Sequence, residues 1–526
     1  MRPIDARRLP PGTALDADLC IVGAGAAGIA LAAALADSGI DVLLVEGGDL
    51  RPDADTQALH EVCSVGYPLR PNYLNRARQF GGTSNLWAGR NMLLWPEDLA
   101  ARAWLPGAAW PLMPDEIEAW HDAAARLLGL PDATPFAPAR WQAQLAASEA
   151  ALFASGRLVP TVSIWARRPM RFGVVHGPAL RRAGNVRTLL RANAVGLGLD
   201  EGRRVVTGVA LATLAGTRLE VRARRVVLAA GGIENARLLL LAGLGGPLVG
   251  RCFMEHPRTV FGKVELVASA RLPLLRGRPF RDGRVQIGLA LAPELQRREG
   301  LLNHHCTLES EVSDYVARTY ETAVDVGKVL LGRGHAGGRL DFTAVGKSRL
   351  EGFIYQLSPK EILPHWAFRA ASALRDRYHR PTGPQRCVLV TFCEQPPDPQ
   401  SQVRLGAERD ALGLPRPVVD WRIPDAVAHS LFRLHEQLGR ELVERGVGRL
   451  EPGDPARLAY TDASHHLGTT RMSDDPAQGV VDPDGRVHGV ANLYVAGSSV
   501  FPSGGHANPT LTIVALALRL AARLRG

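Results

Sequence analysis

Residues 18–46 read DLCIVGAGAAGIALAAALADSGIDVLLVE, and this stretch decides the fold. A short apolar run leads into the glycine-rich turn GAGAAG at 23–28, then into an alanine-rich segment and a second apolar run that ends in Glu46. The order of strand, glycine turn, helix, strand and acid is typical of a dinucleotide-binding unit. The glycines let the backbone approach a pyrophosphate, and the helix N-terminus stabilises its charge. Glu46 is placed to accept from a ribose hydroxyl, which favours FAD or NAD over NADP.

Composition narrows the class of protein. The 526 residues suffice for two or three domains and have the composition of a soluble globular protein. The formal net charge is +10, but the arginines are scattered and form no basic block with interleaved aromatic residues, so we expect no nucleic-acid partner. The six cysteines are widely spaced without a CxxC pair, which predicts free thiols in a reducing compartment. His304, His305 and His335 lack the spacing of metal ligands, so we expect no metal site.

The N-terminal residues predict the compartment. Arg7 and Arg8 are not followed by an apolar region before Pro10, so the start does not resemble a signal peptide. No uninterrupted apolar run reaches the length of a transmembrane helix. We therefore expect a cytoplasmic enzyme without an intrinsic membrane segment, and export or membrane docking through a partner subunit stays open.

Other segments return the chain to the nucleotide-binding unit. The loop GGTS at 81–84 has small side chains that let backbone amides close on a ring or phosphate. Residues 225–230, RVVLAA, read as a buried strand with a glycine exit into a helix at about 234–241. Residues 492–496, NLYVA, read as another buried strand before Gly497. The nucleotide-binding domain is therefore expected to be discontinuous.

The region 258–455 lacks this rhythm. Strand-like stretches at 284–291, 387–392 and 401–405 alternate with helical-looking segments at 311–331 and 359–378. Such a mixture predicts an antiparallel sheet carrying helices, hence a second, α+β domain. The predicted nucleotide-binding domain comprises 1–95, 185–257 and 456–526, and the predicted substrate-binding or cap domain comprises 96–184 and 258–455.

Near the C-terminus, SHHLGTTRM at 464–472 precedes NPTLT at 508–512. Asn is a favoured N-cap and Pro is tolerated at the first helical position, so a helix is expected to begin at Asn508 with its positive dipole end available to an anion. His506 either lines a cavity or closes the preceding glycine loop. Arg471 is interpreted as structural. Glu255 and His256 are interpreted as an isolated acidic-His pair in a satisfied turn.

The tryptophans between residues 87 and 120 are expected to act mainly as core or loop anchors, with one or two lining a substrate cavity.

The motifs GAGAAG with Glu46, GGTS, VVLAAGGIENARLLL, VGRCFMEHP, SQVRL, HHLGTTRM, VVDPDGRVHGVANLYVAGSSVFP and NPTLT follow one another along the chain. In this order they resemble the glucose-methanol-choline (GMC) oxidoreductases, which are flavoenzymes. WAGR and GGHANPTLT are most similar to the branch with pyranose oxidase and the flavin subunits of bacterial sugar and sugar-acid dehydrogenases. The resemblance covers essentially the whole length. It implies an α/β, Rossmann-like, discontinuous FAD-binding domain plus an α+β substrate domain.

The resemblance also implies site residues. It makes His465 the base that takes the hydroxyl proton, Asn508 its partner, and flavin N5 the hydride acceptor. His466 is a rival for His465, but adjacent side chains of an extended segment face opposite ways and the family register favours His465. Leu86 stands where pyranose oxidase has a histidine bonded to the flavin, which implies non-covalent FAD. The expected cofactor-binding residues are Gly23, Gly25, Ala26, Ala27, Gly28, Glu46, Gly81, Gly82, Thr83, Ser84, Ala194, Ala230, Gly231, Gly497, Ser498, Asn508, Pro509 and Thr510.

The expected function is FAD-dependent oxidation of an alcohol group on a sugar, glycoside or related polyol, with oxygen or another electron acceptor. Two alternatives stay open. One is a non-redox lyase of the hydroxynitrile-lyase type, in which the histidine works as acid and base. The other is a flavin subunit of a membrane electron-transfer dehydrogenase complex. A homo-oligomer or an electron-accepting subunit would fit as partner.

Overall fold

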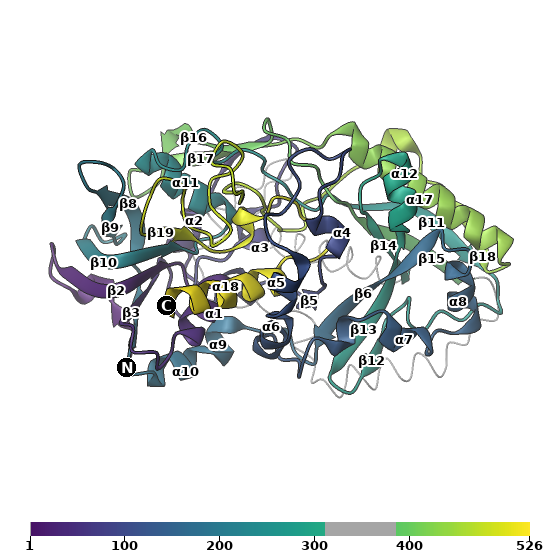
Figure 1. Ribbon diagram of the computed structural model, residues 1–526, viewed down its shortest axis with the longest axis horizontal. Helices are drawn as coiled ribbons and strands as arrows, with labels where there is room; N and C mark the ends of the chain where they lie inside the picture. The colour runs from purple at the N-terminus through teal and green to yellow at the C-terminus, as the bar shows by residue number, and fades with distance from the viewer. Residues whose placement is uncertain (1, 311–384, 526) are drawn as a thin grey trace, which may run out of the picture.

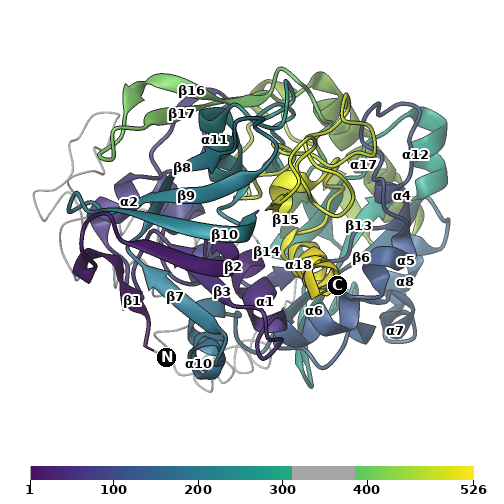
Figure 2. The same cartoon turned by 60° about the vertical axis from the view of Figure 1, so that its left-hand side comes forward.

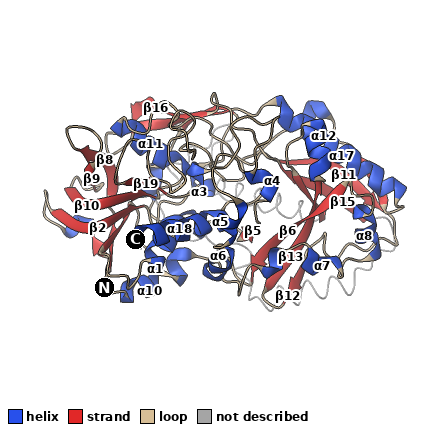
Figure 3. Ribbon diagram, viewed as in Figure 1, coloured by secondary structure: helices blue, strands red, loops and turns tan. Residues whose placement is uncertain are grey.

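The computed structural model describes residues 2–310 and 385–525. Within these ranges, two eight-stranded sheets stand at opposite ends of the molecule with helices between them (Figure 1). The strands of both sheets and the intervening helices are separated by colour in Figure 3. The helical segments expected at 311–331 and 359–378, and His335, lie outside the described residues.

The first sheet is the nucleotide-binding one. Its strand order is β1-β7-β3-β2-β10-β9-β8, and β19 also pairs with β10. The bounds are β1 (Ile4–Asp5), β7 (Val186–Leu190), β3 (Val42–Glu46), β2 (Ala14–Val22), β10 (Arg218–Leu228), β9 (Val206–Ala212), β8 (Asn193–Leu199) and β19 (Leu493–Val495). Pairing is parallel from β1 to β10 and at β19, and antiparallel from β10 to β8. Residues 19–22 and all of β3 are buried, as expected of parallel strands covered on both faces.

The long strand β10 joins three parts of the chain. One edge pairs with β2, with Val226 opposite Cys20 and Leu228 opposite Val22. Its other edge pairs with β9 through residues 218–221 and with β19 through residues 226–228. The C-terminal strand therefore completes the sheet that the first strands began, which confirms that this sheet is built from separate stretches of sequence.

Helices cover this sheet. The bounds are α1 (Ala26–Ala34), α11 (Gly232–Ala242) and α18 (Thr510–Arg525). Helices α1 and α18 pack against each other (Figure 2), and the alanine-rich sequence of α1 permits this close approach. Helix α18 begins two residues later than predicted, since the carbonyl of Pro509 accepts its first bond, from the amide of Ile513.

The second sheet is antiparallel throughout its described strands, which confirms the predicted α+β part of the fold. Its order is β18-β11-β15-β14-β13-β6-β5, with β12 on β13. The bounds are β18 (Gly448–Glu451), β11 (Arg258–Leu266), β15 (Gln385–Phe392), β14 (His305–Ser310), β13 (Gly283–Leu291), β6 (Leu158–Ala166), β5 (Arg90–Asn91) and β12 (Arg278–Phe280). Helix α17 (Asp425–Glu444) packs against β13 and β18.

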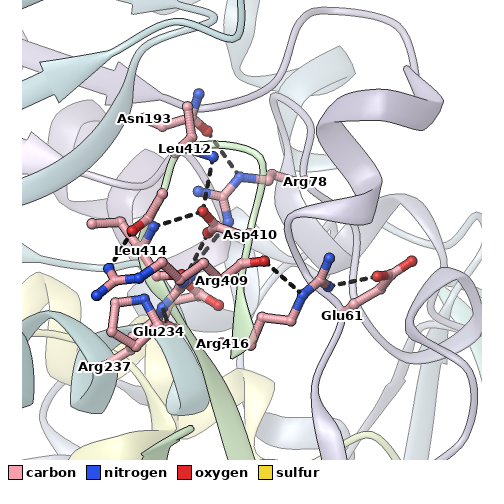
Figure 4. Close-up of polar contacts among 12 residues, drawn as sticks. Glu61, Arg78, Asn193, Glu234, Arg237, Arg409, Asp410, Leu412, Leu414 and Arg416 are labelled. Carbon is pink, nitrogen blue, oxygen red and sulfur yellow. Dashed lines mark hydrogen bonds and ion pairs between the residues drawn. The ribbon is translucent and has the colours of Figure 1, made fainter. Parts of the chain in front are cut away.

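A three-stranded sheet lies against α11. It consists of β16 (Gln402–Arg409), β17 (Pro415–Trp421) and β4 (Cys63–Gly66). Arg237 of α11 binds Asp410 in the loop between β16 and β17 at 2.7 Å, and Arg416 of β17 binds Glu61 at 2.5 Å (Figure 4). The loop is thereby held to the nucleotide-binding side of the molecule, although the domain boundaries along the sequence stay a prediction.

Two further sequence features can be located. In the part of the chain that the structure describes, no helix has both the length and the apolar character that crossing a bilayer requires. All six cysteines are free thiols, and every one except Cys63 is buried.

Candidate active site

Two glycine loops meet at the N-terminus of α1. A Cβ atom on Gly82 would lie 2.6 Å from the Cα of Gly25, so the predicted loop at 81–84 contacts the predicted turn at 23–28 backbone to backbone. Gly23 has a φ of +107°, and a Cβ there would lie 2.5 Å from the carbonyl oxygen of Ala229. Only glycine permits this approach. The turn is consequently wedged between the loop at 81–84 and the end of β10.

The N-terminus of α1 is available to an anion. Its N-cap is Gly25, which has no side chain to accept from the first amides of the helix. Those amides have no partner within the helix, so the turn fits the pyrophosphate of a dinucleotide. Glu46, 6% exposed, accepts from the amides of Ala24 at 2.9 Å and Gly48 at 2.8 Å, one at each carboxylate oxygen. An ionised carboxylate has about four acceptor sites, so Glu46 retains capacity for a ribose hydroxyl.

The exits of β10 and β19 form the next part of the site. Asn235 accepts from the amide of Ala230 at 2.8 Å and donates to the hydroxyl of Ser499 at 3.0 Å. Ser498 donates to the carbonyl of His466 at 2.7 Å, and a Cβ on Gly232 would lie 2.3 Å from that same oxygen. The predicted cofactor residues at 230–231 and 497–498 are therefore brought against the segment that carries the candidate base.

His465 and Asn508 come together as predicted. The Nε2 atom of His465 lies 3.2 Å from the Nδ2 atom of Asn508. The side-chain amide nitrogen of Asn508 is thus directed to the histidine. Burial, followed by the neighbouring His256, His466 and Arg90, lowers the pKa of His465 well below 6.5. The imidazole is therefore neutral at physiological pH and can accept a proton.

His466 points elsewhere. Its ring stacks on Phe253 with an interplanar angle of 28°, and its Nε2 atom lies 3.5 Å from the carboxylate of Glu255. Ser464, which directly precedes the two histidines, has a left-handed φ of +64° and donates from its amide to Asp462 at 3.0 Å. The two histidines thus contact different surroundings, as the alternation argument predicts.

The interpretation of Glu255 and His256 as an isolated turn is wrong. His256 Nδ1 lies 2.9 Å from His465 Nδ1, and His256 Nε2 lies 3.0 Å and 3.3 Å from the carbonyl oxygens of Gly505 and Gly504. Glu255 accepts from the amide of His465 at 2.7 Å. Burial and then Asp462 raise the pKa of Glu255 well above 4.5. The only sequence signal was the place of VGRCFMEHP among the family motifs.

His506 lies at the same site. It is 2% exposed, and neither ring nitrogen has a hydrogen-bond partner among the residues that the structure describes. Its ring stands edge-on to Trp95, with centroids 4.7 Å apart, and 5.5 Å from the ring of His305. Burial, followed by the charges of His256 and Arg90, lowers the pKa of His506 to about 3. A neutral His506 offers one donor and one acceptor.

Polar residues of the antiparallel sheet contact His305, whose ring lies next to that of His506. Arg90 lies 2.7 Å from the hydroxyl of Ser163 and 2.6 Å from Nε2 of His305, while Thr161 contacts Nδ1 of His305 at 2.7 Å. Burial lowers the pKa of Arg90 to about 10, which leaves it protonated at neutral pH. Sequence reasoning did not select these residues, because strands far apart in the chain bring them together.

The tryptophans and Arg471 make contacts that stabilise the fold. The indole N–H of Trp87 donates to the carbonyl of Met170 at 2.7 Å, and that of Trp110 donates to Ser503 at 3.0 Å, so both are anchors. Arg471 is buried and contacts the sulfur of Cys252 at 3.5 Å. Across 2–310 and 385–525, no three His, Cys, Asp or Glu side chains are grouped to hold a metal ion.

Two parts of the chain match known protein families, and longer stretches align with named oxidases. Residues 397–517 match the family model described as GMC oxidoreductase, and residues 21–87 match the NAD(P)-binding Rossmann-like domain. Paromamine 6'-oxidase of Streptomyces fradiae is 26% identical over 570 aligned positions, covering 97% of this chain and 91% of that protein. C-glycoside 3-oxidase of Arthrobacter globiformis is 33% identical over 147 positions, covering 26% of each chain.

A solved structure shows the same fold. Pyridoxine 4-oxidase from Mesorbium loti superimposes with a TM-score of 0.54 at 20% identity, covering 96% of this chain and 99% of that one. The family models, the length of the shared alignment and the fold agree with the motif order along the sequence. Residues 397–517 therefore form a GMC oxidoreductase domain, and the chain as a whole is similar to named oxidases.

Proposed function

We propose that this protein is an FAD-dependent oxidoreductase that converts C–OH to C=O on a sugar, glycoside or related polyol. The observation that carries the proposal is the pairing of a neutral His465 with Asn508 at 3.2 Å, in a chain that also has a glycine cradle formed by the turn at 23–28 and the loop at 81–84. Relatives named as oxidases of paromamine, a C-glycoside and a pyranose support the substrate class. All are oxidases, which favours redox chemistry over the lyase alternative.

His465, Asn508 and His506 have different roles in the proposed reaction. His465 takes the hydroxyl proton at Nε2, for which a neutral imidazole is suited. Asn508 donates its amide N–H to the same substrate oxygen and stabilises its alkoxide character. FAD, when bound, supplies the acceptor for the hydride. His506 offers a donor and an acceptor to a further hydroxyl of the substrate, and Trp95 packs against it.

We assign cofactor binding to the residues predicted for it. The amides of α1 around Ala26, Ala27 and Gly28 would face the pyrophosphate, Glu46 a ribose hydroxyl, and the N-terminus of α18 the negatively charged edge of the ring system. Leu86 cannot form a covalent bond to the ring, which supports a non-covalent cofactor. Oxygen or another carrier as electron acceptor, a partner subunit and a cytoplasmic location remain parts of this proposal.

Replacing Glu46 by alanine should weaken FAD retention. The carboxylate orders the turn through Ala24 and Gly48 and is expected to accept from the ribose. Hydrogen bonds to a charged group contribute about 1.5–3 kcal/mol, so we expect roughly 10- to 100-fold weaker binding. The measurement is flavin absorbance per chain after dialysis. Glu61→Ala removes a carboxylate that pairs with Arg416 outside the cradle and serves as control. Unchanged flavin content in Glu46→Ala would count against the ribose role.

The function itself is tested by anaerobic stopped-flow absorbance. The FAD-loaded protein is mixed with sugars, glycosides, simple alcohols and cyanohydrins, and the flavin band is followed before and after air is admitted. We expect bleaching by one class of sugar or polyol, and the rate of recolouring in air distinguishes an oxidase from a dehydrogenase. Cleavage of a cyanohydrin by a flavin that no alcohol bleaches would replace the proposal by the lyase alternative.

A further inference from the structure

We propose that His256 is a positioning residue that holds His465 in the tautomer whose Nε2 atom is unprotonated. The inference rests on the proposed role of His465 as base. It follows from a chain of contacts that runs from two backbone carbonyls through both imidazoles to Asn508.

The series of contacts begins at Gly504 and Gly505. Their carbonyl oxygens lie 3.3 Å and 3.0 Å from His256 Nε2. A carbonyl oxygen can only accept a hydrogen bond, so Nε2 of His256 must carry the proton. Burial lowers the pKa of His256, which keeps its ring neutral. In a neutral imidazole with a protonated Nε2, Nδ1 is an acceptor.

The protonation of His256 determines which nitrogen of His465 carries a proton. The Nδ1 atoms of His256 and His465 are 2.9 Å apart, and the rings meet nearly edge-on at 82°. Because His256 Nδ1 accepts, His465 Nδ1 must donate. His465 is also neutral, so its Nε2 has no proton and accepts from the amide of Asn508. That lone pair is the one a base uses.

The charges around the two rings agree with this assignment. Arg90 and His466 act on His465 so as to disfavour its imidazolium form. Glu394 favours protonation of His256, but burial outweighs it. Glu255 accepts from the amide of His465 at 2.7 Å and from that of His256 at 3.1 Å, which fixes both backbones.

Glu255 and His256 contact both the segment that carries His465 and the segment that precedes Asn508. Glu255 binds the segment before and at His465, through the amides of Ala463 and His465. His256 binds the carbonyls at 504–505, three residues before Asn508. The segment at 255–256 thereby sets the distance between base and amide as well as the tautomer.

Two variants of His256 test the inference in the FAD-loaded enzyme. His256→Leu removes the acceptor, and we expect flavin reduction to slow roughly 10- to 100-fold, the range for loss of a partner that orients a metal-bound histidine. His256→Asn keeps an acceptor near the Nδ1 position, and we expect rates within about tenfold of wild type. The effect should fall on the limiting rate of reduction and not on substrate KM. A merely structural role would instead alter flavin content and thermal stability in both variants.

A direct readout does not depend on activity or on the variants folding. Neutron diffraction from crystals of the deuterium-exchanged holoenzyme is expected to show deuterium on His256 Nε2 and His465 Nδ1, with His465 Nε2 bare. Deuterium on His465 Nε2 with a bare Nδ1 would overturn the inference. The proposed function can fail independently of the positioning role. If the flavin of His465→Ala is reduced at the normal rate, the proposed function is refuted. If flavin reduction is slow in His465→Ala but fast in His256→Leu, only the positioning role is refuted.

Discussion

Replacement of His465 by alanine is expected to slow flavin reduction by about 10²- to 10⁴-fold, the range for loss of a general base, while FAD stays bound. The imidazole is the group next to Asn508 that can take the hydroxyl proton, whereas the glycine cradle and Glu46 lie on other segments. Anaerobic stopped-flow absorbance gives the rate, and the flavin spectrum of the purified variant gives the cofactor content.

His466→Ala is the matched control for this variant. The variant removes the neighbouring ring, which stacks on Phe253. In the part of the chain that the structure describes, no contact joins this ring to Asn508. We expect a lower unfolding temperature with a reduction rate within about tenfold of wild type. If instead His465→Ala reduces normally and His466→Ala does not, the roles of the two histidines are exchanged.

Replacement of Arg102 by leucine is expected to lower the free energy of unfolding by about 3–5 kcal/mol, the range for removing one partner of a buried ion pair. The two guanidinium nitrogens lie 2.9 Å and 2.5 Å from the carboxylate oxygens of Glu394. The side chains are 5% and 0% exposed, and Glu394 also accepts from the amide of Asn303 at 2.7 Å. Burial opposes ionisation of Glu394, but Arg102 holds its pKa below the usual value. Denaturant unfolding of the holoenzyme measures the loss.

A second arginine–glutamate pair provides the control. Arg449 contacts Glu265 at 2.5 Å, but its side chain is 74% exposed. Exposed pairs contribute about 0–1 kcal/mol, so Arg449→Leu should change stability by no more than that. Combining Arg102→Leu with Glu394→Leu should recover part of the loss, because Glu394 is then no longer a buried carboxylate without its arginine. Equal effects of Arg102→Leu and Arg449→Leu would contradict the burial argument.

The sequence predicted local features well. The unit at 18–46 can be recognised from neighbouring residues alone, because local backbone and charge requirements determine its glycine turn, helix and acid. His465 and Asn508 came from motifs, and the structure brings them together. Helix α18 starts later than predicted, and the side chain of Asn508 contacts His465, 43 positions away in sequence.

Long-range contacts could not be predicted. His256 contacts His465 across 209 positions of sequence, and a buried polar pair has no periodicity that would reveal its partner. Arg90 reaches His305 across 215 positions through the pairing of strands in the second sheet. The order of that sheet depends on side-chain packing between strands from remote parts of the chain, which single-sequence patterns do not encode.

The position of β19 in the first sheet has a consequence for how the protein is made. The edge of β10 at residues 226–228 has β19 as its partner, and β19 is translated more than 260 residues later. Until then a growing chain on the ribosome presents an unpaired strand edge, which is prone to non-native pairing. The segments with His465 and Asn508 also emerge after β10. The complete site therefore cannot form before residues 464–508 have been synthesised, and a truncation before β19 removes a strand of the sheet together with Asn508.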